Sequence, residues 1–385
     1  MRWIYAADIA PADKNGDVMI RSLKVALGAL FLIGAYLVLW PTPVSPVAWD
    51  APVSKGYSGD FAPNAKLANM SLISLDGAIG PEDIVAKIED GELSLYTSTQ
   101  SGAIYEIDPI TKEISEFAQT GGFPLGLEFA ANGNLLVADA YLGLLEVTPE
   151  GDIRILTSSV EGDPIRFADD VDIAPSGIIY FTDASTRFGA ERIGSPLAAS
   201  QLDIIEQSQT GRVLAFDPQS GETTIVADGL GFANGIAVSS DGTTLLVAET
   251  GTYRVVKIDI ADGSKPIPVL TNLPGFPDNI NVGPTLPDGT PTYFLGLAGP
   301  RVPILDNLSN RPFLRKITSR IPTWARPETV HYSLVLQFTE DGNILQTWQD
   351  PDGQFTSTTG AISPGDGYLY ISSVDADSIG RVPFP

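Results

Sequence analysis

The 385-residue chain has no cysteine and a single histidine, His331. The absence of cysteine excludes disulfide scaffolds, thiolate zinc sites, iron–sulfur clusters and cysteine nucleophiles. One histidine excludes a zinc site built from several imidazoles. Any metal site in this protein must therefore use oxygen ligands, which suit hard cations such as calcium or magnesium.

Basic residues are also scarce. The chain has 23 Lys and Arg residues against 47 Asp and Glu residues, which gives a formal net charge of −24. A protein that binds nucleic acid through phosphates needs a clustered basic surface. The charge balance therefore excludes nucleic acid as a partner, while 43% hydrophobic and 18% charged residues are typical of a chain that folds.

The only long apolar run covers residues 22–40, where Lys24 near the start is the sole charge. This length is sufficient to cross about 30 Å of hydrocarbon, so the run predicts a transmembrane signal-anchor. Arg21 and Lys24 flank its start, whereas Asp50 is the first charge after it. The positive-inside bias therefore predicts a cytoplasmic tail at residues 1–21 and an extracytoplasmic remainder, periplasmic or extracellular.

A cleaved signal peptide is the alternative interpretation of the same run. Signal peptides usually carry an apolar stretch of about 7–15 residues followed by a small-residue cleavage site. The run here is longer and ends in Trp40-Pro41-Thr42-Pro43, without such a site. Residues 1–18 are polar and without pattern, which makes Met19 an alternative first residue.

Residues 41–70 are rich in Pro, Ala and Ser and predict a linker. From residue 71 to 385 the chain consists of short β-rich runs broken by Gly, Asp and Asn turns. Six segments share a turn, a β-rich run and then, in most, a small or polar residue, and they are residues 91–96, 133–139, 177–183, 242–249, 289–295 and 367–372. A second β-rich run beginning with Gly follows most of them, as at residues 102–109.

These repeats predict an all-β fold, a six-bladed β-propeller over residues 71–385. A four-stranded blade needs about 40–50 residues. A lone blade cannot bury both of its faces, whereas radial stacking covers each face with the next blade. A parallel α/β fold is disfavoured because amphipathic helical segments between the strands are missing.

One short helix is expected at residues 310–324, between the fifth and sixth repeats and therefore between the fifth and sixth blades. One interpretation is a surface helix that covers a sheet edge. The other is a lid over one mouth of the propeller or a membrane-facing element, because the segment gathers four cations in an acidic chain, Arg311, Arg315, Lys316 and Arg320.

A carboxylate or amide recurs immediately before the β-run that opens a blade, at Glu82-Asp83, Asp169-Asp170, Asn234 and Asp278-Asn279. A single Asp or Asn at such a position normally makes a turn through side-chain to backbone hydrogen bonds. Recurrence in the same context across four blades favours a ligand role instead. Three carboxylates converging on the channel axis would repel one another unless a cation lies among them, and oxygen donors of this number suit calcium.

Several stretches resemble a known family, namely residues 124–129, 133–144, 179–185, 247–250 and 274–279. Over about residues 70–383 the chain resembles the strictosidine synthase-like branch of the SMP-30/gluconolactonase/paraoxonase superfamily, most closely its adipocyte plasma membrane-associated protein type. The resemblance implies a six-bladed propeller with a calcium ion at the channel mouth. It also implies the ligands, which are Glu82, Asn234, Asp278 and, where the family more often has Asn, Asp169; Asn279 is a further candidate ligand.

The resemblance implies a chemistry as well. In lactonase and phosphotriesterase relatives, calcium polarises the substrate and a metal-bound carboxylate acts as base or nucleophile. Asp278 would be that carboxylate and Asp170 a nearby acidic helper. The chain is thus expected to be a membrane-anchored, calcium-dependent hydrolase of a small-molecule ester or lactone. A non-enzymatic binding module with structural calcium is the alternative.

Two departures from the family limit this expectation. Strictosidine synthases need a catalytic glutamate in the last blade, where this chain has the carboxylate-poor residues 358–367. This argues against Pictet–Spengler condensation. Paraoxonase-like enzymes use a histidine dyad at the channel mouth, whereas His331 is alone and is expected to be a structural residue in or beside a strand.

Overall fold

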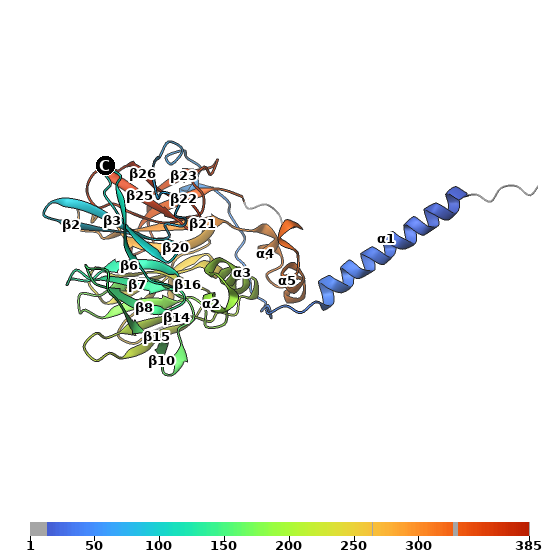
Figure 1. Cartoon of the computed structure of the whole chain (residues 1–385), viewed down its shortest axis with the longest axis horizontal. Helices are drawn as coiled ribbons and strands as arrows, with labels where there is room; N and C mark the ends of the chain where they lie inside the picture. The colour runs from blue at the N-terminus through green and yellow to red at the C-terminus, as the bar shows by residue number, and fades with distance from the viewer. Residues whose placement is uncertain (1–13, 264, 326–329, 385) are drawn as a thin grey trace, which may run out of the picture.

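The computed structural model describes residues 14–263, 265–325 and 330–384. Six four-stranded antiparallel sheets form the six blades of a β-propeller, as the repeats predict (Figure 1). The first blade contains β2 (Ile84–Glu89), β3 (Glu92–Ser98), β4 (Ala103–Ile107) and β5 (Ile114–Gln119). The second contains β6 (Pro124–Phe129), β7 (Leu135–Asp139), β8 (Gly143–Val147) and β9 (Ile153–Thr157).

The third and fourth blades follow along the chain. The third contains β12 (Ala168–Ile173), β13 (Ile179–Asp183), β14 (Gly211–Phe216) and β15 (Thr223–Leu230). A small hairpin of β10 (Ser159–Val160) and β11 (Asp163–Pro164) precedes it. The fourth contains β16 (Ala233–Val238), β17 (Thr244–Glu249), β18 (Arg254–Asp259) and β19 (Ile267–Leu270).

The last two blades complete the ring. The fifth contains β20 (Gly275–Val282), β21 (Thr292–Pro300), β22 (Ser333–Thr339) and β23 (Ile344–Asp350). The sixth contains β24 (Thr358–Ile362), β25 (Tyr368–Ser373), β26 (Ser378–Pro383) and, as its outer strand, β1 (Ser71–Ser74). β1 pairs antiparallel with β26, from Ser71 opposite Arg381 to Ser74 opposite Ser378. The two ends of the propeller therefore meet in one blade.

The hydrophobic core lies between neighbouring blades. Along β7, Leu135 and Val137 pack toward the first blade, and Leu136 and Ala138 pack toward the third. Side chains alternate across a strand, so each face of the blade packs against a different neighbouring blade and both faces are buried. This explains why the repeated runs are continuously apolar and not alternating.

Two helical insertions lie at one mouth of the channel. Inner strands begin at this mouth, and the loops that join the second and third strands of each antiparallel blade return to it. α2 (Ala190–Ile193) and α3 (Pro196–Glu206) lie between β13 and β14. α4 (Pro303–Asn307), α5 (Pro312–Thr318) and the 3₁₀ turn η3 (Thr323–Ala325) lie between β21 and β22. We call residues 190–206 and 303–325 together the cap.

The cap differs from the sequence prediction in two respects. The helix expected at residues 310–324 is shorter and lies within the fifth blade, not between the fifth and sixth. The helix α3 was not predicted, although Ser195 caps its N-terminus by accepting a hydrogen bond from the Ala198 N–H and Pro196 occupies its first turn.

Residues 41–57, part of the expected linker, lie across the mouth as an extended strap. The Ser45 and Val47 N–H groups donate to Glu206 of α3, and Arg301 donates to the Pro52 carbonyl. Tyr57 stacks on Tyr332 with ring centroids 3.9 Å apart. The short turn η1 (Gly59–Phe61) then leads toward β1.

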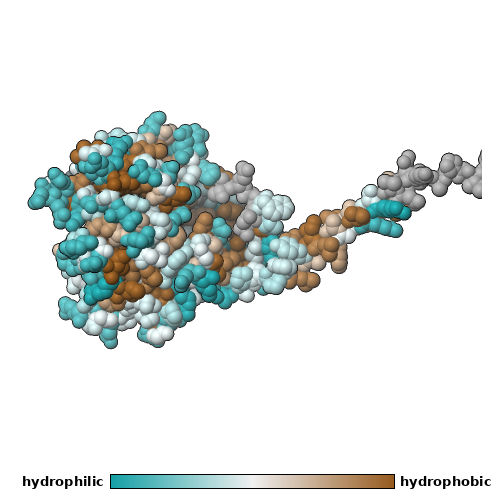
Figure 2. Space-filling model, viewed as in Figure 1, coloured by the Kyte–Doolittle hydropathy of each residue, from teal (hydrophilic) through white to brown (hydrophobic). Residues whose placement is uncertain are grey.

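The apolar run is a helix, α1 (Lys14–Leu39), which projects away from the propeller on the side of the cap (Figure 1). Residues Met19–Leu39 are long and apolar enough to cross a membrane, and this segment is not buried against the rest of the protein. Figure 2 shows a continuous apolar surface along this helix.

Candidate metal and catalytic site at the propeller mouth

The inner strands share a one-residue bulge at the mouth. In β6, β12, β16, β20 and β24 the pairing register shifts so that two residues oppose one on the neighbouring strand. The two unpaired residues are 125–126, 169–170, 234–235, 278–279 and 359–360, and in the first blade residues 82–83 take the same place directly before β2. Bulges re-aim side chains, and those of β12, β16 and β20 fall at sequence positions expected to bind the metal.

The first residue of each bulge forms what we call the mouth ring. Its members around the channel are Glu82, Leu125, Asp169, Asn234, Asp278 and Thr359. Four of these are the ligands implied by the sequence. Leu125 and Thr359 were not identified, although aligning residues 124–127 and 358–361 with the other inner strands would have revealed them.

The polar members of the ring are buried with oxygen atoms left free. Glu82, Asp169, Asn234 and Asp278 expose 3 to 7% of their surface. Among the described residues, four buried oxygens here accept no hydrogen bond, and these are Glu82 Oε2, Asp169 Oδ2, Asn234 Oδ1 and Asn279 Oδ1. Unsatisfied buried acceptors are costly, so four of them at the mouth, on four different blades, are a property expected of a cation site.

The carboxylates of the ring face one another. Burial raises the pKa of Glu82 well above its usual value, and the charges of Asp278 and Asp169 raise it further. Burial and the Asp278 charge likewise raise the pKa of Asp169. Burial raises the pKa of Asp278 to about 7, although a hydrogen bond from Asn234 opposes this shift. A cation among these groups would relieve the repulsion.

A metal held at the mouth ring would need amide oxygens in addition to carboxylates. Among the described residues, no three carboxylate or imidazole groups lie close enough to hold a metal by themselves. Asn279 donates to both the carbonyl and Oε1 of Glu82, at 3.0 Å each, and its own Oδ1 remains free. Glu82, Asp169, Asn234, Asp278 and Asn279 together offer oxygen donors that fit calcium.

The second bulge residue alternates between a polar side chain and glycine. Asp83, Asp170 and Asn279 occupy the odd-numbered blades, and Gly126, Gly235 and Gly360 the even-numbered ones. Asp170 Oδ2 accepts from the Ile236 N–H of the next blade at 2.8 Å, and Asp83 Oδ2 accepts from the Leu127 N–H at 2.9 Å. Asp170 therefore links blades, which leaves its expected catalytic role a prediction.

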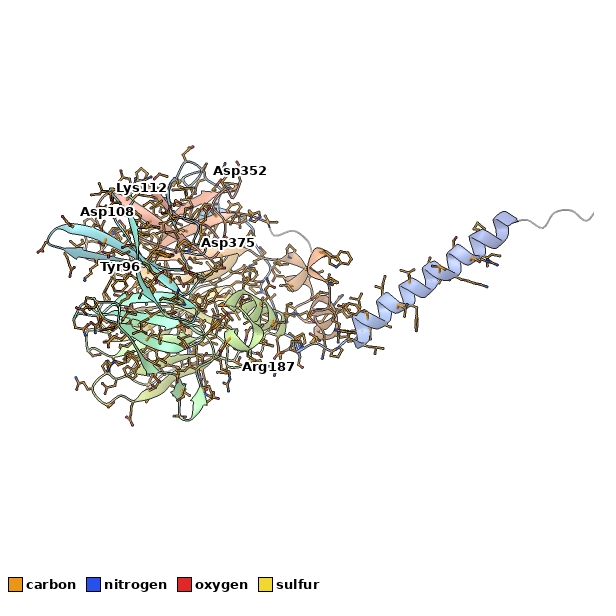
Figure 3. All side chains as sticks on the ribbon, viewed as in Figure 1. Tyr96, Asp108, Lys112, Arg187, Asp352 and Asp375 are labelled. Atoms are coloured by element: carbon orange, nitrogen blue, oxygen red, sulfur yellow. The ribbon has the colours of Figure 1, made fainter. Side chains whose placement is uncertain are left out.

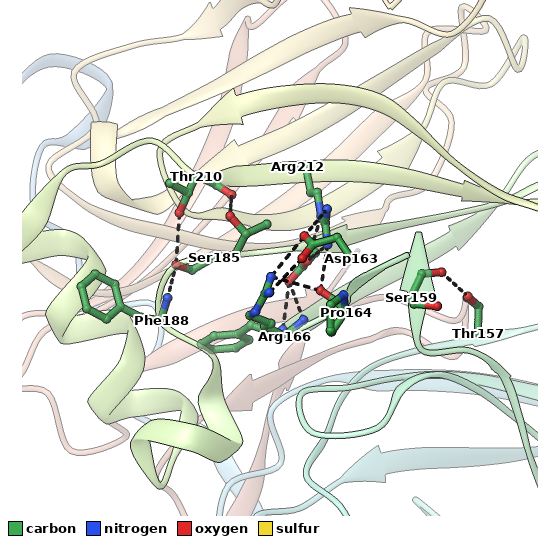
Figure 4. A network of polar contacts seen from close by, with 12 residues as sticks. Thr157, Ser159, Asp163, Pro164, Arg166, Ser185, Phe188, Thr210 and Arg212 are labelled. Atoms are coloured by element: carbon green, nitrogen blue, oxygen red, sulfur yellow. Dashed lines mark hydrogen bonds and ion pairs between the residues drawn. The ribbon is translucent and has the colours of Figure 1, made fainter. Parts of the chain in front are cut away.

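A polar network fixes the start of β12 and thereby Asp169 (Figure 4). Asp183, at the end of β13, is fully buried and accepts from the N–H groups of Arg166 and Phe167. Arg212 binds Asp183 at 2.9 Å and Asp163 at 3.1 Å. The network thus ties the approach to the mouth ring to the second and third strands of the same blade.

An apolar cluster covers one side of the ring. Val44 of the strap is fully buried against Leu125, Phe167 and Phe232. The two phenylalanines, which stand two residues before Asp169 and Asn234, pack edge to face with centroids 5.3 Å apart. The cluster places apolar surface directly beside the oxygen donors.

Two other features lie apart from the ring. His331 is exposed just before β22. A cavity of about 210 Å³ is lined by residues below the bulges on the inner strands, including Glu128, Asp172 and Asn281. Burial raises the pKa of Asp172 to about 6 and that of Glu128 well above its usual value.

Comparison with known proteins agrees with this architecture. The family model described as strictosidine synthase matches residues 169–262, and that of the strictosidine synthase-like N-terminal region matches residues 59–107. The adipocyte plasma membrane-associated protein of Salmo salar is 31% identical, with 92% of this chain and 88% of the relative covered. Protein STRICTOSIDINE SYNTHASE-LIKE 13 of Arabidopsis thaliana is 34% identical, with 76% and 69% covered.

Solved structures share the fold at low sequence identity. A gluconolactonase from Xanthomonas campestris superposes with a TM-score of 0.56 at 17% identity, with 89% of this chain and 99% of the other covered. The calcium-binding protein regucalcin from Agrobacterium tumefaciens gives 0.52 at 14% identity, with 80% and 92% covered.

Proposed function

Because this chain belongs to the strictosidine synthase-like family of the SMP-30/gluconolactonase superfamily, we propose that it is a membrane-anchored, calcium-dependent hydrolase of small-molecule esters or lactones. The observation that carries the proposal is the set of four buried oxygens at the mouth, contributed by four different blades, that accept no hydrogen bond among the described residues. They would hold the ion together with Asp278.

The metal would supply one element of the chemistry, polarisation of the substrate carbonyl. Asp278 would take a proton from the attacking water, and Asn234 donates a hydrogen bond that orients its carboxylate. Leu125, Phe167 and Phe232 would pack against the apolar part of the substrate and exclude bulk water from the ring.

The anchor of the proposed enzyme would be α1. Its 21-residue apolar segment matches the thickness of a bilayer, and the similarity to an adipocyte plasma membrane-associated protein covers 92% of this chain. By the positive-inside bias, Arg21 and Lys24 at its start would keep the N-terminus in the cytoplasm and the propeller on the extracytoplasmic side.

Replacement of Asp278 tests the reaction. Asp278→Asn keeps the shape of the side chain but removes the proton acceptor, so we expect hydrolysis of lactones and aryl esters to fall by about 10²-fold or more. Asp288→Asn, in an exposed turn, is the matched control and should keep full activity. Undiminished turnover in Asp278→Asn, or in the presence of a calcium chelator, would rule out this mechanism.

A binding module with structural calcium is the second candidate. It is favoured by the near-complete burial of the mouth ring beneath the strap and cap. On this hypothesis the ion would hold the blades together and no substrate would be turned over. Absence of hydrolysis across lactones and aryl esters of graded chain length, with calcium bound, would select it.

A further inference from the structure

The cap is joined directly to the end of the membrane helix. Arg320 donates to the carbonyl of Trp40 at 2.5 Å and to the carbonyl of Leu37 at 3.1 Å, so it caps the C-terminal turn of α1. Thr42 and Ser319 hydroxyls lie 3.0 Å apart at the same junction. If Met19–Leu39 crosses the hydrocarbon, these contacts hold the end of α5 at the membrane surface.

Hydrogen bonds join the two parts of the cap to each other and to the strap. Arg315 is buried and donates to the carbonyl of Ile204 in α3 at 2.6 Å and to that of Val47 in the strap at 3.3 Å. Arg187 joins Glu206 to the Pro43 carbonyl, and Figure 3 shows it beside the chain that leads to α1. Figure 1 shows the cap between the blades and α1. The mouth of the propeller is therefore turned toward the membrane helix.

The cap exposes large apolar side chains at this location. Phe313 of α5 is 60% exposed and Trp324 of η3 is 86% exposed. Others on the cap are Leu197, Ile304 and Leu314. Exposed apolar side chains gathered on short helices are typical of a surface that inserts into the boundary between headgroups and acyl chains.

The second part of the cap, residues 303–325, is basic, whereas the chain as a whole is acidic. Residues 303–325 of the cap contain four basic residues and one acidic residue, Asp306, in a protein of net charge −24. Arg315 and Arg320 are buried in the contacts above, whereas Arg311 is exposed and Lys316 is partly exposed. Exposed cations beside apolar side chains suit anionic lipid headgroups.

We propose that the cap is a membrane-binding surface, which seats the mouth of the propeller on the bilayer that α1 crosses. The inference rests on the proposed anchoring by α1 but not on hydrolysis. Of the two interpretations of the basic helix expected at residues 310–324, the proposal favours the membrane-facing element over the surface helix that covers a sheet edge. Substrates of the mouth ring would accordingly be lipophilic molecules that reach it from the membrane.

The absence of cysteine allows this orientation to be measured on the full chain. Single variants Phe313→Cys, Leu30→Cys and Ile110→Cys are labelled with bimane and reconstituted in phosphatidylcholine vesicles containing one-quarter phosphatidylglycerol, with and without doxyl-labelled lipid. Ile110 is the matched control because it is 86% exposed but lies between Asp108 and Lys112, far from α1 (Figure 3).

We expect doxyl lipid to quench the labels at residues 30 and 313 severalfold more than the label at residue 110. Quenching at residue 30 but not at 313 would overturn the membrane-binding surface and leave the anchor intact. No quenching at either would overturn the anchor and, with it, this inference. A label at residue 313 that is shielded from water but not quenched would show that a second copy of the chain covers the cap, which also contradicts the proposal. Hydrolytic activity affects none of these results.

Discussion

At the scale of single residues, buried carboxylates are placed where backbone donors need partners. Asp83 and Asp170 each accept backbone N–H groups from their own and the next blade. Asp183 and Glu249, at the ends of the second strands, accept from the segments that lead into the inner strands of their own blades, β12 and β16. The acidic composition of the chain is thus used partly to build the propeller and not only for the site.

The carboxylate of Asp203 in α3 should make stability depend on pH. Burial raises its pKa to about 7, although the Ser185 hydroxyl donates to it at 2.6 Å and opposes the shift. In the unfolded chain the pKa of this group is about 4. Between about pH 4 and 7 the folded state therefore keeps a proton that the unfolded state has released. The free energy of unfolding should therefore fall as the pH rises through this range.

Asp203→Asn removes this contribution while it keeps an acceptor for Ser185. We expect the variant to lose less stability than the parent between pH 5 and 8 and to melt at a higher temperature at pH 8. Asp228→Asn, at an exposed position, is the control. Identical pH profiles for parent and Asp203→Asn would contradict the assignment.

The sequence predicts the residues of the mouth ring better than their partners. Glu82, Asp169, Asn234 and Asp278 could be identified because the same local context recurs before each inner strand. Leu125 could not be identified in this way, because its apolar side chain has no oxygen that could bind a cation. The Ile236 N–H that donates to Asp170 lies in the next blade, 66 residues along the chain, so spacing alone does not reveal this contact.

At the scale of elements, the inner strands depend on close approach between neighbouring blades. A methyl group on Gly235 of β16 would overlap the carbonyl oxygen of Asp278 and the Cα of Asn279 in β20. Backbone atoms cannot move aside as a side-chain end can, so a larger residue must push two inner strands apart.

Gly235→Ala should accordingly destabilise the protein by about 1–3 kcal/mol and weaken calcium binding, because β20 carries Asp278. Gly299→Ala is the matched control, since no atom lies within 4 Å of the added methyl group. Thermal unfolding and calcium titration of both variants make the test. Equal melting temperatures would show that the blades have room to adjust.

The helices were harder to predict than the strands. Strands repeat six times, whereas α3 and α5 each occur once, and α5 has only seven residues. Short helices are marginal alone and are stabilised by tertiary contacts. Here those contacts are the Arg315 hydrogen bonds to Ile204 and Val47, which join segments more than 100 residues apart.

At the scale of the whole molecule, the proposed ion would join four blades across the channel. Glu82, Asp169, Asn234 and Asp278 come from the first, third, fourth and fifth sheets along the chain. A ligand that binds only the folded state stabilises it by an amount that grows with its concentration, about 2.7 kcal/mol at a hundredfold excess over Kd.

Removal of calcium should therefore lower the melting temperature of the entire propeller in one transition. Scanning calorimetry in calcium and in chelator measures the difference, and Asp278→Asn should reduce it, whereas Asp288→Asn should not. A melting temperature that is indifferent to chelator would argue against an ion at the mouth ring.

The pairing of β1 with β26 joins residues about 310 positions apart, from Ser71 to Arg381. The chain is synthesised from its N-terminus, so β1 leaves the ribosome before any of its blade partners exist. Its backbone donors and acceptors stay unmatched until the final strand arrives. During synthesis β1 must consequently stay protected while five complete blades are made. A truncation that removes β26 would leave β1 permanently without its partner.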